Sequence, residues 1–433
     1  MLKQIADLER VARQPEDWQR IAKAYMRLAK LYPNDHRFLA NSAHAQWLSG
    51  DAASARLIYR QAVLLKPDCH ILYRGIGNAL VDIGDFAAAE RAYRHSLDLC
   101  VDEETRWNLS QLLIGMGRLE EGYELAENRW AMKRVTAWRP GQITTQQDAL
   151  DSKQPLLIWS EQGFGDIFQH LPWIFRLQKM RGNDAQPLRL EVEGCLAGLM
   201  RRLIRHLNPR PHVHEKDPHQ AGPWDGQHVS LLSLPRLLGF SELGKMQRQE
   251  SLSRAFAPVA KSANCPRVGL VWAAGRKLDD PIAAREYWLR SLDQQTLGRL
   301  IQGVSELGCQ CVLMQFGPDR DAAAPWSGLF AHQLSENADF EVTAELVMEL
   351  DLVITVDTAM AHLAGLLSKP VWVLLPYCAA PRWGRGSSTT PWYPTMKLFR
   401  QEKPWEWSSP IDQLLQALSS HILRVQAYTG KRC

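Results

Sequence analysis

Apolar side chains in the first 130 residues follow a helical spacing, and the whole pattern repeats along the chain. The same residue types return after 34 positions: Pro33 and Pro67, Gly50 and Gly84, Asp51 and Asp85, Ala55 and Ala89, and Tyr59 and Tyr93. Each unit consists of an apolar helical stretch, a Gly-Asp turn and a second helical stretch with alanine where two helices approach closely. Such a period predicts a stack of helix pairs, in which each pair buries its apolar face against the next.

The repeating region resembles the tetratricopeptide repeat. Leu39, Tyr73 and Trp107 form a further register, although the first unit is partial and the third is degenerate. The stack predicts a curved groove of the kind that holds an extended or helical peptide. A scaffold, or a surface that joins two copies of the chain in a homo-oligomer, is the alternative interpretation. We therefore expect a helical repeat domain over 1–130, with protein contacts through the repeats, and a polar connector over 131–153.

The apolar pattern changes at Pro155, where short β-rich runs begin to alternate with helical stretches. The runs PLLIWS, LRLEV and HVSLLSL form one series, and RVGLVWAAG, CQCVLMQFG, LDLVITVDT and PVWVLLP form a second. This alternation predicts two doubly wound α/β halves, each a parallel sheet covered by helices on both faces. We expect the first half over 154–258, the second over 259–408, and a C-terminal helix over 409–433 that packs back on the first half. The predicted fold class is thus α+α/β, with ligands at the carboxyl ends of the strands.

Composition and charge narrow the class of protein. The chain has 433 residues, 45% of them hydrophobic, which is ample apolar material for two or three cores. Its formal net charge is +4 and it has no block rich in Lys and Arg, which argues against nucleic acid as a partner. The N-terminus has no hydrophobic signal region, so we expect no membrane span and a cytoplasmic protein. Its eight cysteines are scattered, so we expect neither a metal site nor a disulfide framework.

The first candidate for chemistry is the stretch EQGFGDIFQHLP, where a buried strand gives way to a helix. Gln162, Gly163 and Gly165 form the loop, whose glycines would let the backbone turn sharply and approach a ligand. Asp166 opens the helix. Its carboxylate either serves chemistry or caps the helix, since Asp is favoured in the first turn. The stretch is not a dinucleotide fingerprint, because Phe168 occupies the place of the third glycine.

The second candidate lies where the strand LDLVITV ends at Asp357 and Thr358. His362 and Gly365 follow on the first turns of the next helix. Backbone N–H groups at that helix start, the Thr358 hydroxyl and the His362 ring together predict a cradle for a diphosphate. Asp357 would instead cap the helix or accept hydrogen bonds from a ribose or sugar hydroxyl, because an anion repels phosphate. His362 also has a plainer interpretation, as a histidine satisfied on a helix face.

A cationic loop precedes the second helix series. Between Ala273 and Arg290 it carries Arg276, Lys277 and Arg285 among few apolar positions. Cations beside a phosphate site would neutralise a departing diphosphate. Solvated surface charge is the alternative interpretation for at least half of them. The second half is therefore the candidate donor side, with Arg276, Lys277 and Arg290 as the candidate cations.

Nine short motifs together indicate an enzyme family: EQGFGDIFQHLP, LLSLP, GLVWAAG, RSL, VITVDTAMAHLAG, PVWVLLP, PRW, PWYP and LFRQ. In this order and spacing they resemble the bacterial tetratricopeptide-repeat glycosyltransferases whose catalytic region is similar to the heptosyltransferases of glycosyltransferase family nine. The resemblance covers nearly the whole chain. It implies a GT-B fold of two Rossmann-like domains, with the nucleotide sugar on the C-terminal one and the acceptor entering from the N-terminal one. It also implies inverting transfer without a metal or other cofactor.

The same resemblance implies roles for individual residues. Asp166 matches the general base of the family's Gly-Asp motif, while Asp357, Thr358 and His362 match the loop that grips the donor diphosphate. Ser291 matches the second member of an Arg-Ser pair in this subfamily. The sequence WAAGRK stands where WAGN is common, so heptose is not carried over with the family name.

Three functions fit this sequence. The first is a cytoplasmic glycosyltransferase that uses a nucleotide sugar and whose repeats present a protein acceptor. The second sends the sugar to lipopolysaccharide core or another glycan, with the repeats as a docking surface. The third is a repeat scaffold with a decayed transferase domain. The Trp-rich segment 376–407 is expected to be an ordered irregular segment over the cleft mouth.

Overall fold

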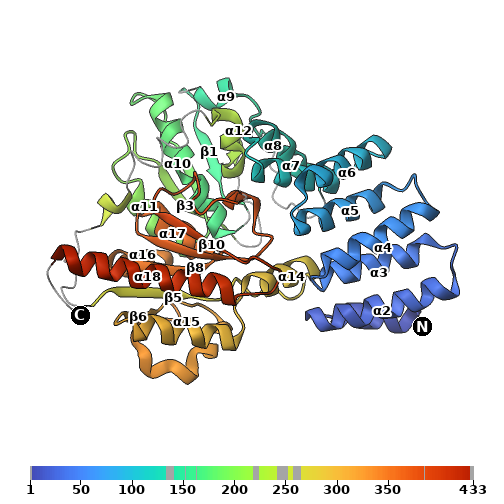
Figure 1. Ribbon diagram of the computed structural model, residues 1–433. Helices are drawn as coiled ribbons and strands as arrows, with labels where there is room; N and C mark the ends of the chain where they lie inside the picture. Colours follow the sequence, from blue (N-terminus) through green and yellow to red (C-terminus); the bar gives the residue numbers. More distant parts are fainter. Residues whose placement is uncertain are drawn as a thin grey trace.

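The N-terminal region is an array of helices (Figure 1). The computed structural model describes residues 2–132, 141–151, 153–161, 163–217, 224–240, 252–256, 265–384 and 386–429. The array consists of α1 (Leu2–Val11), α2 (Pro15–Leu31), α3 (His36–Leu48), α4 (Ala52–Leu65), α5 (His70–Ile83), α6 (Phe86–Leu99), α7 (Glu103–Gly115) and α8 (Leu119–Ala126). Consecutive helices pack against each other along the array. This confirms the predicted stack of tetratricopeptide-like repeats.

The Gly-Asp pairs of the repeats form the turns between paired helices. Gly50 and Gly84 have φ angles of 90° and 88°, a left-handed conformation that favours glycine. Asp51 and Asp85 follow and cap the second helix of each pair by accepting a backbone N–H. In the third unit Arg118 occupies the capping position without a side-chain hydrogen bond, and α8 has only 8 residues. The loss of this cap is the physical counterpart of the degenerate third repeat.

The first α/β half contains a four-stranded parallel sheet with the order β3-β2-β1-β4. Its strands are β1 (Leu156–Trp159), β2 (Arg189–Val192), β3 (His212–Glu215) and β4 (Gln227–Ser230), and its helices are α9 (Gln146–Leu150), α10 (Phe164–Arg181), α11 (Gly194–Leu203) and α12 (Leu234–Leu238). The expected connector is partly structured, because Ile143 is buried and its N–H donates to the carbonyl of His228 at 2.9 Å. Residues 141–151 therefore belong with this half.

The second half contains a six-stranded parallel sheet with the order β10-β9-β8-β5-β6-β7. Its strands are β5 (Arg267–Val271), β6 (Gln310–Leu313), β7 (Phe330–Gln333), β8 (Leu352–Val356), β9 (Val371–Leu375) and β10 (Met396–Arg400). Its helices are α14 (Pro281–Arg290), α15 (Gln294–Glu306), α16 (Phe340–Glu349), α17 (Ala359–Leu366) and α18 (Ser408–Thr429). Counted from its own first strand, each sheet follows the Rossmann winding 3-2-1-4. The predicted fold class, helical repeats followed by two Rossmann-like halves, is confirmed.

Three strands escaped prediction. The edge strands β3 and β7 are mostly exposed, so no apolar run marks them. β10 lies within 376–407, the segment expected to be irregular, and pairs in parallel with β9. The expectation for this part of the segment was wrong, because a short strand among Pro and Trp residues carries little periodic signal.

The last helix also departs from expectation. The C-terminal helix over 409–433 was expected on the first half, but α18 packs against α15, β9 and β10 of the second half. Its apolar residues Ile411, Leu414, Leu418 and Ile422 join the core cluster built around β5 and β6. Figure 1 shows α18 lying along the second sheet. The prediction was wrong because an amphipathic pattern identifies the apolar face of a helix but not the surface that covers it.

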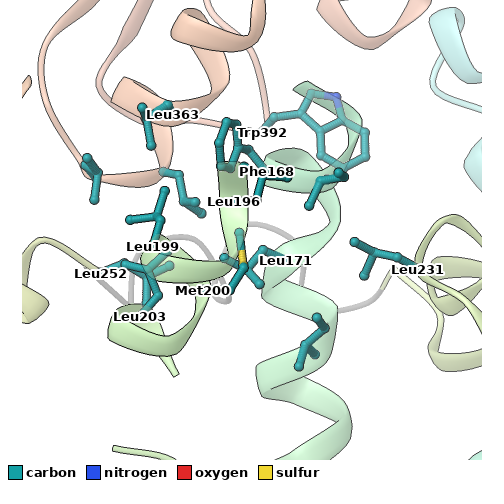
Figure 2. Close-up of a cluster of buried hydrophobic side chains, with 14 of the residues drawn as sticks. Phe168, Leu171, Leu196, Leu199, Met200, Leu203, Leu231, Leu252, Leu363 and Trp392 are labelled. Atoms are coloured by element: carbon teal, nitrogen blue, oxygen red, sulfur yellow. The ribbon is translucent and has the colours of Figure 1, made fainter. Parts of the chain in front are cut away.

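One hydrophobic cluster joins the two halves (Figure 2). Buried residues of α10 and α11 share one cluster with Leu363 and Trp392 of the second half: Phe168, Leu171, Leu196, Leu199, Met200 and Leu203. α10 also packs directly on α17. The halves are therefore in contact through the helices that follow β1 and β8.

The repeats dock on both halves. Toward the second half, Arg285 donates Nε to the carbonyl of Trp47 at 2.9 Å and forms an ion pair with Asp82. A cavity of about 520 Å³ lies between the repeats and the second half. Toward the first half, Arg129 and Glu161 form a buried ion pair at 2.6 Å, and α8 packs against α12. The last repeat also faces the helix that carries Asp166, because the Tyr123 hydroxyl on α8 lies 3.0 Å from Nε2 of His170 on α10.

Candidate active site

The topology places the predicted motifs at one edge of each sheet. In both sheets the winding reverses between two neighbouring strands, β1 and β4 in the first and β5 and β8 in the second. Ligands of doubly wound sheets bind in the crevice outside the carboxyl ends of strands at such a point. The stretch after β1 contains Asp166, and the stretch after β8 contains Asp357 and Thr358. Both candidate stretches therefore lie beside the switch point of their sheet, one after the first strand of its half and the other after the fourth strand of its half.

Asp166 both caps α10 and forms an ion pair. Gly163 is the N-cap residue, and its N–H donates to Oδ2 of Asp166 at 3.3 Å. The other carboxylate oxygen, Oδ1, lies 2.6 Å from Nη1 of Arg382 in the second half. The Asp166 side chain is 16% exposed. The Asp166 side chain therefore both caps the helix and pairs with a cation. Gln162, the third residue expected in this loop, lies outside the described residues.

Gly165 lets the first turns of α10 and α17 touch. A Cβ at this position would lie 2.8 Å from Cδ2 of His362 and 3.6 Å from the Cα of Ala359. The first distance is shorter than real Cβ contacts allow, so a larger residue would push the helices apart. The close approach expected of this glycine is therefore an approach to the opposite half. As a result, the positive ends of two helix dipoles converge near Asp166.

The charge state of Asp166 depends on burial and on Arg382. Burial raises the pKa of the Asp166 carboxyl, but its neighbours, with Arg382 foremost among them, together hold that pKa below its ordinary value. For Arg382, burial lowers the pKa of the guanidinium, while Asp166 and Asp357 raise it above its ordinary range. The pair is therefore fully ionised near neutral pH.

Two histidines near Asp166 are neutral. Burial lowers the pKa of His170 to about 4 and that of His362 to about 3. His170 Nδ1 lies 2.7 Å from the carbonyl oxygen of Asp166, and its Nε2 lies 3.0 Å from the hydroxyl of Tyr123 on α8. His362 Nδ1 lies 2.9 Å from the hydroxyl of Tyr393. Both rings are therefore fixed by hydrogen bonds and carry no charge near neutral pH.

His362 and Gly365 lie inside the second half. His362 is only 2% exposed, and its ring stacks on Trp383 with centroids 5.0 Å apart. A Cβ on Gly365 would lie 2.6 Å from the ring of Tyr393, so this glycine makes room for the tyrosine that orients His362. Any contact of His362 with a diphosphate would therefore be a hydrogen bond from a neutral ring.

Thr358, not Asp357, caps α17. The Thr358 hydroxyl accepts the N–H of Met360 at 3.3 Å. The suggestion that Asp357 caps this helix is therefore wrong. Asp357 is 4% exposed, and its Oδ2 has no hydrogen-bond partner among the described residues. The nearest cation is Arg290, whose Nη1 lies 3.7 Å from that oxygen.

The cations of the loop after β5 are separated by the structure. Arg290 lies beside Asp357. Arg276 and Lys277 are exposed, and Arg285 faces the repeats instead. Ser291, whose role was open, accepts the N–H of Ala274 at 3.1 Å and so fastens the start of this loop to the end of α14.

A small cavity connects Asp166 to the repeats. It measures about 60 Å³. One wall comes from α7, α8 and the residues just after them, and the other from α10, Leu232 and Arg382: Trp107, Gln111, Ile114, Tyr123, Ala126 and Arg129 face Asp166, Gln169 and His170. Sequence reasoning did not connect the third repeat or Arg382 with this site. The motifs PRW and PWYP, which carry Arg382 and Tyr393, were the available signal.

Neither a metal-binding cluster nor a membrane-spanning helix is found among the described residues. Within the described ranges, no group of three or more His, Cys, Asp and Glu side chains has the arrangement of a metal site. No helix in the same ranges has the length and apolar character needed to cross a bilayer.

Comparison with known proteins gives distant similarities. No family model matches the chain. Protein FlbA of Caulobacter vibrioides is 26% identical over 399 residues, which cover 85% of this chain and 64% of FlbA. The chain thus spans less than two thirds of the length of that relative.

Among solved structures, the chain is similar to the E. coli ADP-heptose lps heptosyltransferase II, at 13% identity and a TM-score of 0.40, over 63% of this chain and 99% of that one. It is also similar to a mutant of the Thermobaculum terrenum O-GlcNAc transferase, at 14% identity and a TM-score of 0.32, over 98% of this chain and 92% of that one.

Proposed function

We propose that the chain is an inverting, metal-independent glycosyltransferase that moves a sugar from a nucleotide sugar to a hydroxyl group of a protein held by the repeats. The acceptor oxygen forms a bond to the anomeric carbon as the bond from that carbon to the diphosphate breaks. Asp166 takes the acceptor's proton as general base, and the second half stabilises the departing nucleoside diphosphate. The nucleotide sugar is a substrate, and no further cofactor takes part.

The observation that carries this proposal is the cavity between α7 and Asp166. Its volume of about 60 Å³ suits the hydroxyl-bearing end of a side chain or a few water molecules. The repeat side contributes Trp107 and Gln111, an aromatic ring and an amide that suit a peptide. An acceptor segment that lay along the repeats would thus bring its hydroxyl group to the carboxylate of Asp166. This continuity supports a protein acceptor over a glycan.

The donor side is supported by the groups around Asp357. Its unpartnered carboxylate oxygen suits a hydroxyl of the ribose or of the sugar, because a buried acceptor without a donor is costly. Arg290 and the first N–H groups of α17 suit the diphosphate. Arg276 and Lys277, exposed on the same loop, are proposed to add charge only when a donor is bound.

The cytoplasm is the proposed location. No disulfide joins two cysteines within the described residues, as expected in a reducing compartment. Transfer to lipopolysaccharide core or another glycan remains the second candidate, with the repeats as a docking surface. It is favoured only if the third repeat proves indifferent to the acceptor.

A transfer assay tests the proposal. The purified chain is incubated with radiolabelled nucleotide sugars, one at a time, and a heat-treated bacterial lysate, and the label is traced to protein or glycan fractions. We expect one donor to label protein, and mass spectrometry to place the sugar on a hydroxyl side chain. Calorimetric titration with nucleoside diphosphates runs in parallel. A chain that binds none of them and labels nothing is the decayed scaffold.

Variants of the third repeat decide between the acceptors. Gln111→Ala and Trp107→Ala remove the repeat wall of the cavity, so protein labelling is expected to fall several-fold while nucleotide binding is unchanged. Gln61→Ala, an exposed residue of α4 outside the cavity, is the matched control. If a glycan is labelled and all three variants label it equally, the protein acceptor is refuted.

A further inference from the structure

Arg382 connects the second half to the candidate base on the first. It lies in the short 3₁₀ turn Pro381–Trp383, which follows β9. Its Nη1 contacts Oδ1 of Asp166 at 2.6 Å and donates to Oε1 of Gln169 at 3.0 Å. The two acceptors lie about one turn apart on α10, so a single guanidinium nitrogen bridges them. The Arg382 side chain is 26% exposed, so it lies at the edge of the cavity rather than free in solvent.

The turn that carries Arg382 is itself held in place. Nη2 of Arg400, at the end of β10, donates to the carbonyl of Trp383 at 2.6 Å. The ring of Trp383 is buried and stacks on His362. Arg382 therefore approaches α10 from a support made by β10 and α17, and its position depends on how the second half sits against the first.

Arg382 is the cation that faces Asp166 directly. His170 on α10 and His362 on α17 are neutral, because burial lowers both pKa values well below neutral pH. The hydroxyls of Tyr123 and Tyr393 also lie near the carboxylate, and burial raises the pKa of both. The Asp357 carboxylate acts on Arg382, and Arg129 is paired with Glu127 and Glu161.

We propose that Arg382 is the positioning residue of the reaction: its guanidinium, paired across the two halves, aims the Asp166 carboxylate at the cavity and supplies the positive charge beside it. This inference rests on the proposed function, because it assigns Arg382 a role in proton removal by Asp166. A carboxylate bound through one oxygen to Arg382 and through the other to the Gly163 N–H has little rotational freedom. Orientation of this kind is a recognised source of rate enhancement.

The test compares Arg382→Gln with Arg382→Lys. Glutamine keeps an amide that can donate to Asp166 but has no charge, whereas lysine keeps the charge without the planar fork. We expect the acid limb of the kcat/KM profile to move to higher pH in Arg382→Gln and to stay near that of the parent in Arg382→Lys. We also expect kcat to fall by roughly 10²-fold in Arg382→Gln, with the KM for the donor little changed.

A spectroscopic measurement makes the test independent of turnover. The carboxyl carbon of Asp166 is followed by NMR titration in protein labelled at aspartate, and its signal is assigned with Asp166→Asn. The titration midpoint is expected to rise in Arg382→Gln. Arg201→Gln, which breaks an exposed ion pair with Glu215, is the matched control and should leave the midpoint in place.

The outcomes separate two kinds of failure. If the parent chain transfers sugar but Arg382→Gln keeps the parent's pH profile and titration midpoint, the role of Arg382 is refuted and the function stands. If the parent chain transfers no sugar, the proposed function is refuted, and the role of Arg382 with it. Thermal unfolding of each variant shows whether a lost activity is only lost folding, and Arg382→Lys then carries the comparison.

Discussion

The regions around the first turns of α10 and α17 have similar residues, but their aspartates differ in how closely they are paired with a cation. Each helix follows a buried central strand of a Rossmann-like sheet, and each places an aspartate near its start and a histidine further along: Asp166 with His170, and Asp357 with His362. Asp166 is paired with Arg382 at 2.6 Å, whereas the buried Oδ2 of Asp357 has no hydrogen-bond partner among the described residues, and Nη1 of Arg290 lies 3.7 Å from it. Both histidines are buried and neutral.

Under the proposed function, this difference in pairing suits the two aspartates to different tasks. A paired carboxylate is oriented and ionised without a ligand, as a general base needs to be before its substrate arrives. A buried carboxylate oxygen without a partner is costly until a ligand supplies a donor. Under the proposed function, proton removal therefore belongs to the first half and hydroxyl recognition to the second.

The largest expected effect comes from exchanging each carboxylate for an amide. Asp166→Asn should reduce kcat by about 10²- to 10⁴-fold, because it removes the base. Asp357→Asn should mainly raise the KM for the donor, by about tenfold, because it weakens one hydrogen bond to a bound hydroxyl. Steady-state kinetics measures both. Asp184→Asn, an exposed residue after α10, is the control, and equal kinetic effects at Asp166 and Asp357 would contradict the division of tasks.

The contact between the two helix starts is tested at Gly165. Gly165→Ala places a methyl group 2.8 Å from His362, so we expect a destabilisation of about 1–3 kcal/mol and a loss of transfer. Denaturant unfolding measures the first effect and the transfer assay the second. Gly163→Ala is the control from the same turn, because its Cβ would meet only Oδ2 of Asp166 at 3.6 Å. Equal stabilities of the two variants would disprove the tight contact.

The two histidines predict a stability that depends on pH. Their pKa values, about 4 for His170 and about 3 for His362, are depressed by burial, so below about pH 6.5 the unfolded chain binds protons that the folded chain does not. The free energy of unfolding should therefore fall as pH drops from 6.5 toward 4. The loss is at most about 1.4 kcal/mol per pH unit for each histidine.

Denaturant unfolding at pH 7, 6 and 5 measures this slope. His170→Gln and His362→Gln should each make it shallower, whatever they do to stability at pH 7. His332→Gln, in an exposed strand residue, should leave it unchanged. A slope that is the same in all four proteins would show that neither buried ring is kept neutral by the fold.

The smallest expected effect concerns the loop cations. Arg290→Gln should raise the KM for the donor about two- to fivefold, because Arg290 is partly exposed and its contact with Asp357 is long. Arg276→Gln should change it less, since Arg276 is exposed and lies over Tyr287 rather than beside Asp357. The KM for the donor, measured for both variants at two salt concentrations, checks this order of effects. A larger rise in KM for Arg276→Gln than for Arg290→Gln would contradict the choice of Arg290 as the main donor-side cation.

The repeats and the central strands could be predicted from the sequence, because both depend on local patterns of apolar and turn residues. The 34-residue period predicted the repeats, because each Gly-Asp pair encodes a left-handed turn followed by a helix cap. Buried apolar runs predicted the central strands and placed Asp166 at the start of the helix after the first of them, and Asp357 and Thr358 at the end of β8. The exposed strands β3 and β7 were missed, since such strands leave no apolar run.

Only the tertiary structure decided which surfaces meet. The partner of Asp166 is Arg382, 216 positions away in sequence, and the wall opposite Asp166 comes from Trp107 and Gln111 of the third repeat. The same holds for α18, whose apolar face fits its own sheet rather than the first half. The apolar period of a helix or strand shows which of its faces is buried. Contacts between residues far apart in the sequence form only when packing brings their elements together.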